Sequence, residues 1–303
     1  MLASAALTTA ALTFTPVARA QDAGAMRARE TALHTQLANN PFKRPLVLES
    51  TQASGSVKGE IYAVVAQPYS VVGPAVQGMG HWCDILILHL NVKSCASQGS
   101  GETSILSLAV GRKFDQPVAD AYRIDFAYRV ASNQADYLHV QLSAEAGPLG
   151  TKNYRLALEA IPLDATSSFV HMSYAYAYGF TAQIAMQAYL ATTGRDKVGF
   201  SVIDHRVDGT PVYTGDLRGV VERNTMRYYL AIEAYLGATS LPPAQQPEQR
   251  LRDWFSAVER YPRQLHEMER DAYLAMKRKE LAQGLSVTRT PHPNPLPLIG
   301  EKG

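Results

Sequence analysis

The sequence predicts an α+β fold, in which an antiparallel sheet is followed by a long helix and a C-terminal helical extension. Between residues 55 and 178, apolar and polar residues alternate in a series of short segments, which is the period of strands with one buried face. Pro68 ends the first of these strands, and two short helix-like segments broken by glycines follow it. Helical spacing returns after Gly179. The expected order is one strand, two short helices, six strands and a long helix.

The first strand and the two short helices occupy residues 55–84. Small or apolar residues at odd positions from 57 to 65 alternate with polar ones such as Lys58 and Glu60, as in a half-buried strand. Beyond Pro68, apolar residues repeat at helical spacing, and the glycines that follow keep both helices short. The stretch ends in an aromatic corner that contains Trp82.

Six further strands are expected before residue 179. Ile85 to Lys93 is predicted as the second strand, with one apolar face and with His89, Asn91 and Lys93 in phase on the other face. A turn rich in glycine and serine then leads into a hairpin. The remaining strands are expected at Ser104 to Arg112, Tyr122 to Val130, Asp136 to Glu145, Tyr154 to Ile161 and Ser168 to Tyr178.

Helices are expected on both sides of these strands. An amphipathic helix over Ala25 to Asn39 precedes the sheet. After the sheet, helical spacing covers Phe180 to Gly194, Asp216 to Leu236 and Glu248 to Gln283. The last of these contains Pro262, so we expect it to form two consecutive helices.

The order of elements over about residues 55–194 resembles the START-like superfamily, also called helix-grip or SRPBCC. The resemblance implies that a curved sheet and a long helix, here Phe180 to Gly194, hold an apolar ligand between them. The later helices lie outside the family pattern and are expected to cover or brace the sheet. We therefore expect an N-terminal helix and connector at 21–54, a START-like domain at 55–203 and a helical extension at 204–284.

Both ends of the chain look detachable. Residues 1–20 carry one charge, Arg19, and an apolar run that ends in Ala18-Arg19-Ala20, which is typical of a signal peptide; a buried N-terminal helix is the alternative. Residues 285–303 contain prolines at alternate positions, which predict a disordered tail; a polyproline recognition segment is the alternative. We expect the mature protein to be periplasmic or secreted.

Charge and hydropathy limit the partners. Each detachable end carries one net positive charge, so removing both brings the formal charge of +2 to neutral. A neutral core disfavours nucleic acid or an anionic membrane surface as the main partner. No later apolar run approaches the length of a transmembrane segment. No protein partner can be named from the sequence.

The two cysteines, Cys83 and Cys95, fit an exported protein. An oxidising compartment favours their pairing as a disulfide, and two buried thiols are the alternative. A fully extended connection would hold the two residues too far apart, so the chain must fold back between them if they are bonded.

The sequence contains no recognised catalytic motif for a serine hydrolase, a zinc protease, a phosphate-binding loop or a dithiol oxidoreductase. Histidines, cysteines and an aspartate occur between residues 81 and 95, but no pair has helical metal-ligand spacing, so we expect no metal site. No cofactor is expected. Enzymatic activity is left open, with a binding protein preferred.

The candidate ligand-binding residues combine polar groups with an aromatic wall. The predicted polar face of the second strand is either solvated or lines a cavity, and the tyrosines of two strands either pack in an ordinary core or surround a ligand. In the ligand-binding interpretation, a positive charge from Lys93 or Arg112 faces an acidic or carbonyl head. The full set is His89, Asn91, Lys93, Arg112, Phe126, Tyr128, Tyr174 and Tyr176.

Three functions are compatible with these patterns. The first is an exported binding protein for a hydrophobic small molecule or lipid, which rests on the resemblance and on the lack of enzyme motifs. The second is a cyclase- or hydrolase-like enzyme that uses an isolated histidine, such as His89 or His171, in an apolar pocket. The third is a protein without a ligand, which binds a partner through the helices around Trp254 and Phe255.

Overall fold

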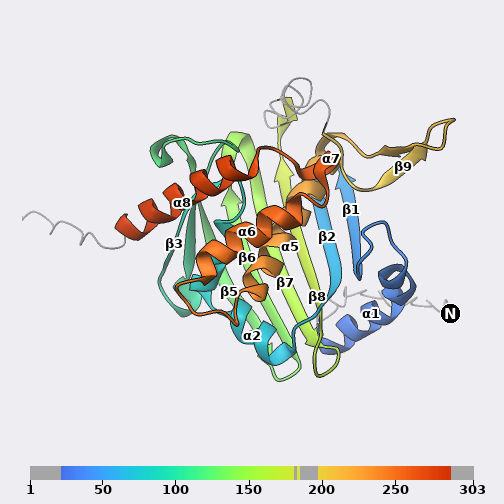
Figure 1. Cartoon of the computed structure of the whole chain (residues 1–303), viewed down its shortest axis with the longest axis horizontal. Helices are drawn as coiled ribbons and strands as arrows, with labels where there is room; N and C mark the ends of the chain where they lie inside the picture. Colours follow the sequence, from blue (N-terminus) through green and yellow to red (C-terminus); the bar gives the residue numbers. More distant parts are fainter. Residues whose placement is uncertain (1–21, 181–182, 185–196, 288–303) are drawn as a thin grey trace, which may run out of the picture.

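An eight-stranded antiparallel sheet forms the centre of the protein in the computed structural model, which describes residues 22–180, 183–184 and 197–287 (Figure 1). The strand order is β1-β2-β8-β7-β6-β5-β4-β3, so β2 pairs with β8 and β1 lies at the edge beside β2. The strands are β1 Leu46–Ala53, β2 Ser56–Val65, β3 Val92–Gln98, β4 Ile105–Val110, β5 Tyr122–Gln134, β6 Tyr137–Ala146, β7 Thr151–Pro162 and β8 Ser168–Tyr178. A separate hairpin is made of β9 Val202–His205 and β10 Pro211–Tyr213.

Helices lie on both faces of the sheet. They are α1 Ala23–Ala38, α2 Tyr69–Gln77, α3 Met79–Leu86, α5 Asp216–Gly237, α6 Gln246–Val258, α7 Pro262–Leu265 and α8 Arg270–Val287. Three single 3₁₀ turns, η1 Gly101–Thr103, η2 Val118–Asp120 and η3 Pro148–Gly150, join strands. The fold is α+β, with an antiparallel sheet and a C-terminal helical region. Among the described residues, no helix combines the length and the apolarity needed to span a membrane.

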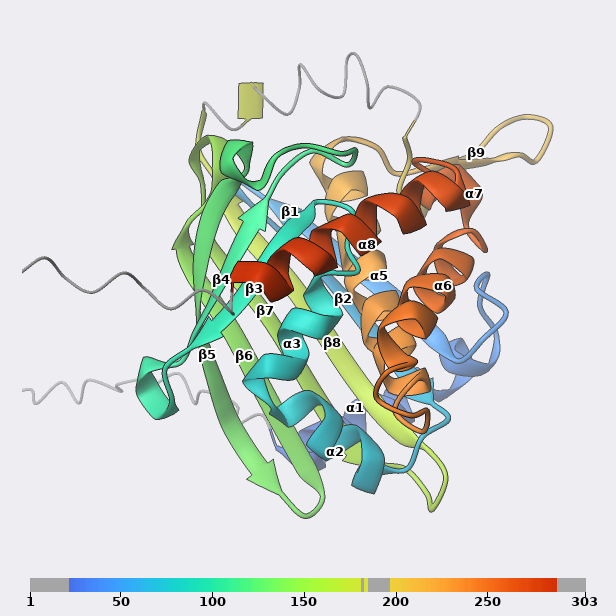
Figure 2. The same cartoon turned by 60° about the vertical axis from the view of Figure 1, so that its left-hand side comes forward.

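The inner face of the sheet carries the main core. Figure 2 shows α2, α3, α5 and α8 on one side of the curved sheet, and α5 contacts β1, β2 and β8. This is the helix-grip arrangement, a long helix held against a curved sheet. The helix approaches β2 closely at Gly59, where an added Cβ would lie 2.2 Å from the Oγ1 of Thr225. A residue without a side chain is therefore required at that crossing.

The outer face carries a smaller core under α1. Met26, Leu33 and Leu37 recur along one side of this helix and are buried. They pack against outward-facing side chains of the sheet, namely Val47, Tyr62, Tyr137, Ile161 and Phe169. The N-terminal helix predicted from the sequence thus covers one end of the outer face.

The predicted second strand, Ile85 to Lys93, is wrong. Residues 79–86 form α3, residues 87–91 form a turn, and the strand β3 begins only at Val92. Trp82, Ile85 and Leu86 are buried at helical spacing, and a short continuous apolar run has no period that separates a strand from a buried helix. His89, Asn91 and Lys93 therefore do not lie in phase on one strand.

The turn after α3 brings the two cysteines together. Cys83 in α3 and Cys95 in β3 form a disulfide, with their Cα atoms 5.2 Å apart. The reversal of the chain at residues 87–91 allows this approach, which an extended strand over 85–93 would have prevented. The bond fixes the direction of α3 relative to the edge strand of the sheet.

The helix that lies across the inner face is α5. The sequence had suggested that Phe180 to Gly194 would hold the ligand against the sheet, but that segment lies almost wholly outside the described residues. Phe180 and Ile184, which are described, are exposed. The predicted signal peptide at 1–20 and residues 288–303 of the predicted tail also lie outside the described residues.

Candidate functional site

A cavity of about 210 Å³ lies between the inner face of the sheet and α5. Its walls come from β4 to β8, from the end of α3 and the turn after it, and from η3, while α5 contributes the opposite side. The lining residues are Leu86, His89, Asn91, Leu108, Val110, Ile124, Phe126, Leu142, Pro148, Leu149, Thr151, Tyr154, Leu156, Tyr174, Tyr176, Val220, Asn224 and Tyr228. Most of this surface is aliphatic or aromatic, as in pockets for apolar ligands.

Four tyrosines form an aromatic wall around the cavity. The ring of Tyr154 stacks on that of Tyr176 with centroids 5.4 Å apart, and Tyr174 lies 5.2 Å from Tyr228 across the gap between β8 and α5. Strands β7 and β8 supply the first three rings, because odd or even positions in a strand all face the same side. These contacts hold the rings in fixed orientations.

Three of the tyrosine hydroxyls lack a hydrogen-bond partner among the described residues. The hydroxyl of Tyr154 donates to Thr151 Oγ1 at 2.7 Å, whereas those of Tyr174, Tyr176 and Tyr228 make no hydrogen bond within the described part of the chain. Burial raises the pKa of each of these three phenols, so they stay protonated. Buried tyrosine hydroxyls usually find partners, so these three are available to a polar group in the cavity.

His89 supplies the imidazole of the cavity and is 2% exposed. Its Nδ1 accepts a hydrogen bond from the backbone N–H of Asn91 at 3.1 Å, which places the single proton of a neutral ring on Nε2. Nε2 makes no hydrogen bond of normal geometry to any described residue. The His89 ring stacks on Tyr228, with centroids 4.7 Å apart.

The electrostatic surroundings keep His89 neutral. Burial lowers its pKa well below the ordinary value of 6.5, and the positive charges of Arg227, Lys277 and Lys113 lower it further. A hydrogen-bond interaction with the side chain of Asn224 raises the pKa of His89, but burial and the positive charges outweigh it. A neutral ring with its proton on Nε2 is a hydrogen-bond donor at that atom and not a base there.

The turn that bears His89 is fixed by α8. The hydroxyl of Tyr273 donates to the carbonyl of Leu88 at 3.0 Å, and Nζ of Lys277 donates to the carbonyls of His89 at 2.8 Å and Val92 at 2.7 Å. The C-terminal helix therefore donates hydrogen bonds to backbone carbonyls of the turn and of the start of β3. It acts as a brace behind the cavity wall.

The structure brings five of the predicted ligand-binding residues to this cavity and places three elsewhere. His89, Asn91, Phe126, Tyr174 and Tyr176 line it. Tyr128 faces the inner core at another point, where its hydroxyl donates to the carbonyl of Gln77, and Arg112 is exposed with its guanidinium 5.7 Å from the centre of the Phe114 ring.

Lys93 has a structural position. It is fully buried, and its Nζ lies 3.0 Å from Oε1 of Glu280 in α8 and donates to the carbonyls of Leu90 and Phe114. The sequence did not predict this pair, because Glu280 lies 187 residues further along the chain and no local pattern reveals it.

Sequence reasoning missed Tyr154, Asn224 and Tyr228. Tyr154 lies in phase with Leu156 and Leu158 of the predicted sixth strand, so the alternation could have found it. Asn224 and Tyr228 are one turn apart on α5 and share a face. Their helix had been assigned to the extension, so no pattern tied them to the sheet.

A second titratable cluster lies on the outer face, away from the cavity. His171 on β8 contacts Glu159 Oε2 at 2.7 Å through Nδ1 and Glu60 Oε1 at 3.0 Å through Nε2. The hydroxyl of Tyr137 donates to Glu159 at 2.6 Å, and the Tyr62 ring stacks on the imidazole. Both ring nitrogens thus contact carboxylates, so His171 has a structural role.

Among the described residues, no group of three or more His, Cys, Asp or Glu side chains could hold a metal ion.

Several solved structures show a weak structural similarity to this chain. Norcoclaurine synthase from Thalictrum flavum is 17% identical over 50% of this chain and 80% of its own, with a TM-score of 0.33. The Zhui aromatase/cyclase from Streptomyces sp. R1128 is 12% identical over 71% of this chain and 96% of its own, with a TM-score of 0.32. A START superfamily protein from Mycobacterium smegmatis is 14% identical over 50% and 88%, with a TM-score of 0.30. No family model matches the chain, and no curated protein sequence does.

Proposed function

We propose that this protein binds a small hydrophobic molecule carrying one or more oxygen groups in the cavity between the sheet and α5. One observation carries the proposal: Tyr174, Tyr176, Tyr228 and His89 line an apolar cavity, and neither the three hydroxyls nor Nε2 of His89 has a hydrogen bond of normal geometry to a described residue. Polar groups of this kind fix the orientation of a ligand whose body contacts the apolar walls.

The volume of the cavity favours a compact ligand. A dry protein cavity of about 150 Å³ accepts benzene. At about 210 Å³, the present cavity suits a molecule with one or two fused rings. A long acyl chain needs more space, so a small aromatic molecule is the preferred ligand and a lipid is the less favoured one.

Binding is favoured over catalysis by the state of His89. An isolated histidine acts as a general base through a nitrogen that lacks a proton, and Nδ1 of His89 already accepts the backbone N–H of Asn91. Nε2 carries the proton and can donate to a carbonyl, ether or hydroxyl oxygen. The imidazole therefore supports recognition of a ligand oxygen.

We also propose that the protein works outside the cytoplasm. The signal-peptide pattern of residues 1–20 and the bond between Cys83 and Cys95 support this location, because disulfides persist in oxidising compartments. Detection of the protein in periplasmic or culture fractions, with the chain cleaved after Ala20, tests it.

Titration calorimetry with 1-naphthol, naphthalene and palmitate tests the binding site. We expect 1-naphthol to bind more tightly than naphthalene, and palmitate to bind weakly. Val110→Phe places a ring into the cavity and should abolish binding, whereas Val130→Phe adds the same bulk on an inner-face strand position outside the lining. Tight binding of palmitate alone, or equal loss of 1-naphthol binding in both variants, would contradict the proposal.

A further inference from the structure

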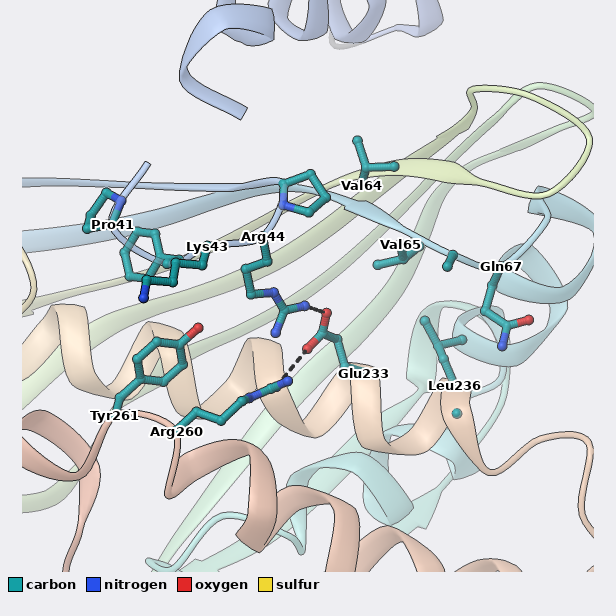
Figure 3. A pocket seen from close by; sticks show the side chains of 14 residues that line it. Pro41, Lys43, Arg44, Val64, Val65, Gln67, Glu233, Leu236, Arg260 and Tyr261 are labelled. Carbon is teal, nitrogen blue, oxygen red and sulfur yellow. Dashed lines mark hydrogen bonds and ion pairs between the residues drawn. The ribbon is translucent and has the colours of Figure 1, made fainter. Parts of the chain in front are cut away.

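A second depression lies beside the turn that joins α1 to β1, and it shares no lining residue with the cavity (Figure 3). Its volume is about 810 Å³, and it is open to solvent. It is lined by Pro41, Phe42, Lys43, Arg44, Pro45, Val64, Val65, Ala66, Gln67, Glu233, Leu236, Gly237, Arg260 and Tyr261. We name this depression the Arg44 groove.

The charges of the Arg44 groove are unbalanced. Lys43, Arg44 and Arg260 contribute three positive charges, and Glu233 is the single carboxylate among the lining residues. Figure 3 shows Arg44 and Arg260 reaching toward Glu233 from two sides. The groove thus concentrates a positive surplus equal to the formal charge of the whole chain, which is +2. An anion is the complementary ligand.

Arg44 is held in place and keeps one donor free. Its Nη2 donates to Glu233 and lies 3.5 Å from the hydroxyl of Tyr229, which itself donates to the same carboxylate at 2.6 Å. The guanidinium also lies 5.7 Å from the centre of the Tyr229 ring. Nη1 has no hydrogen-bond partner among the described residues. Nη1 itself is buried, and an unsatisfied buried donor is stabilised by an acceptor that reaches it.

The turn that presents these cations is built by Asn40. Its side-chain amide donates to the carbonyls of Gln36, Leu37 and Arg44, and its oxygen accepts the backbone N–H of Phe42. Lys43 has a φ of 54°, a left-handed conformation that is costly for a lysine. A long cationic side chain thus occupies a strained position at the edge of the groove, where glycine would avoid the strain.

We propose that the Arg44 groove binds a small organic anion, either a carboxylate or a phosphate monoester. Nη1 of Arg44 and the side chains of Arg260 and Lys43 hold the oxyanion. Val65, Leu236 and the ring of Tyr261 supply apolar surface for the organic part of the ligand. Glu233 keeps Arg44 in position.

Calorimetric titration at low ionic strength tests this site with phenyl phosphate, benzoate and inorganic phosphate as probes. We expect saturable binding of phenyl phosphate, tighter than that of inorganic phosphate. Arg260 is about half exposed, so Arg260→Gln should fold normally and weaken binding about tenfold, the value of one charged hydrogen bond. Arg44→Lys keeps the charge next to Glu233 but removes Nη1, and should weaken binding by a similar factor.

Two controls make the result specific. Arg206→Gln removes an equal charge from the exposed hairpin and should leave the affinity unchanged. Val110→Phe, which fills the separate cavity, should also leave it unchanged. Loss of phenyl phosphate binding in Val110→Phe would move the ligand to the cavity and overturn the site. Absence of saturable binding in the unaltered protein, or an equal loss in Arg206→Gln, would also overturn it. Equal affinity for phosphate and phenyl phosphate would contradict the contribution of the apolar walls.

Discussion

Nζ of Lys93 lies 3.0 Å from Oε1 of Glu280, and Nζ of Lys277 lies 2.8 Å from the other oxygen of the same carboxylate. All three side chains are at most 2% exposed. One buried glutamate thus serves two buried lysines, and together they join α8 to the turn behind the cavity. A carboxylate shared in this way is the critical member of the cluster, because its loss leaves two like charges buried.

Glu280→Gln should therefore destabilise the protein more than Lys93→Met. Removal of the carboxylate should lower the free energy of unfolding by about 3 to 5 kcal/mol. Lys93→Met leaves Lys277 and Glu280 as a neutral pair and loses hydrogen bonds to two carbonyls, which costs about 1 to 3 kcal/mol. Urea unfolding of both variants measures the difference. The reverse order would show that Glu280 does not hold the cluster together.

The cluster around His171 predicts a stability that depends on pH. Burial lowers the pKa of His171, but hydrogen bonds and charge from Glu159 and Glu60 outweigh burial and raise it above 6.5. A raised histidine pKa gives stability that is complete below pH 6.5 and is lost as the pH rises through the folded-state value. The pKa of Glu60 is lowered to about 2: burial raises it, and hydrogen bonds from His171 and Lys58 outweigh burial.

We expect the stability difference between the unaltered protein and His171→Gln to be largest near pH 5 to 6 and to decrease toward pH 9. Below the ordinary glutamate value of 4.5, protonation of the unfolded carboxyl groups should reduce it again. Urea unfolding of both proteins across this range measures the difference. His34→Gln, which changes an exposed histidine of α1, is the control and should show no such profile. A difference that does not vary with pH would mean that His171 is uncharged in the folded protein.

Gly59→Ala should destabilise the protein at the crossing of β2 and α5. The new Cβ would lie 2.2 Å from the Oγ1 of Thr225, so the helix must move away from the strand. Overpacking of this kind costs about 1 to 3 kcal/mol. Gly80→Ala is the control, since an added Cβ there meets nothing within 4 Å. It should leave stability unchanged or raise it by about 0.5 to 1 kcal/mol, because alanine favours the helix. Thermal melts that show equal effects would contradict the close approach.

The sequence predicted the strands of the sheet well where one face is buried and the other is wet. In β5, Ile124, Phe126 and Tyr128 alternate with exposed residues, and the expected period appears directly in the burial. The prediction of a strand over Ile85 to Lys93 failed for a physical reason: its first four residues, Ile85 to Leu88, are all apolar, and such a run does not distinguish a strand from a buried helix. Pairings across the chain, such as Lys93 with Glu280, follow from tertiary packing and leave no local signal.

The lining of the cavity was also predicted only in part, where strand alternation places the residues. Tyr174 and Tyr176 were predicted to lie on the same face of the sheet because they are two residues apart on β8. Their opposite wall depends on which helix lies on the sheet. The sequence indicated Phe180 to Gly194 as that helix, whereas packing brings α5, with Asn224 and Tyr228, to the cavity. The polarity of His89 was recognised, while its position in a turn was not.

Substitution of His89 should affect ligand binding and the stability of the fold differently. In His89→Phe, the new ring can keep the stacking contact with Tyr228 and the apolar wall. The Asn91 N–H loses its acceptor, which costs about 1 kcal/mol, but the unsatisfied Nε2–H is also removed from the interior. These effects oppose each other, so the free energy of unfolding should change by at most about 1 kcal/mol.

Ligand binding should respond differently in the same variant. If Nε2 donates to a ligand oxygen, His89→Phe should weaken 1-naphthol binding about two- to tenfold, since a hydrogen bond contributes about 0.5 to 1.5 kcal/mol. Naphthalene has no oxygen and should bind equally to both proteins. Tyr273→Phe removes the hydroxyl that supports Leu88, without touching the cavity lining, and should weaken 1-naphthol less. A parallel loss of both probes in His89→Phe would show that the ring only shapes the cavity, because a directional hydrogen bond can act only on the probe that carries an acceptor.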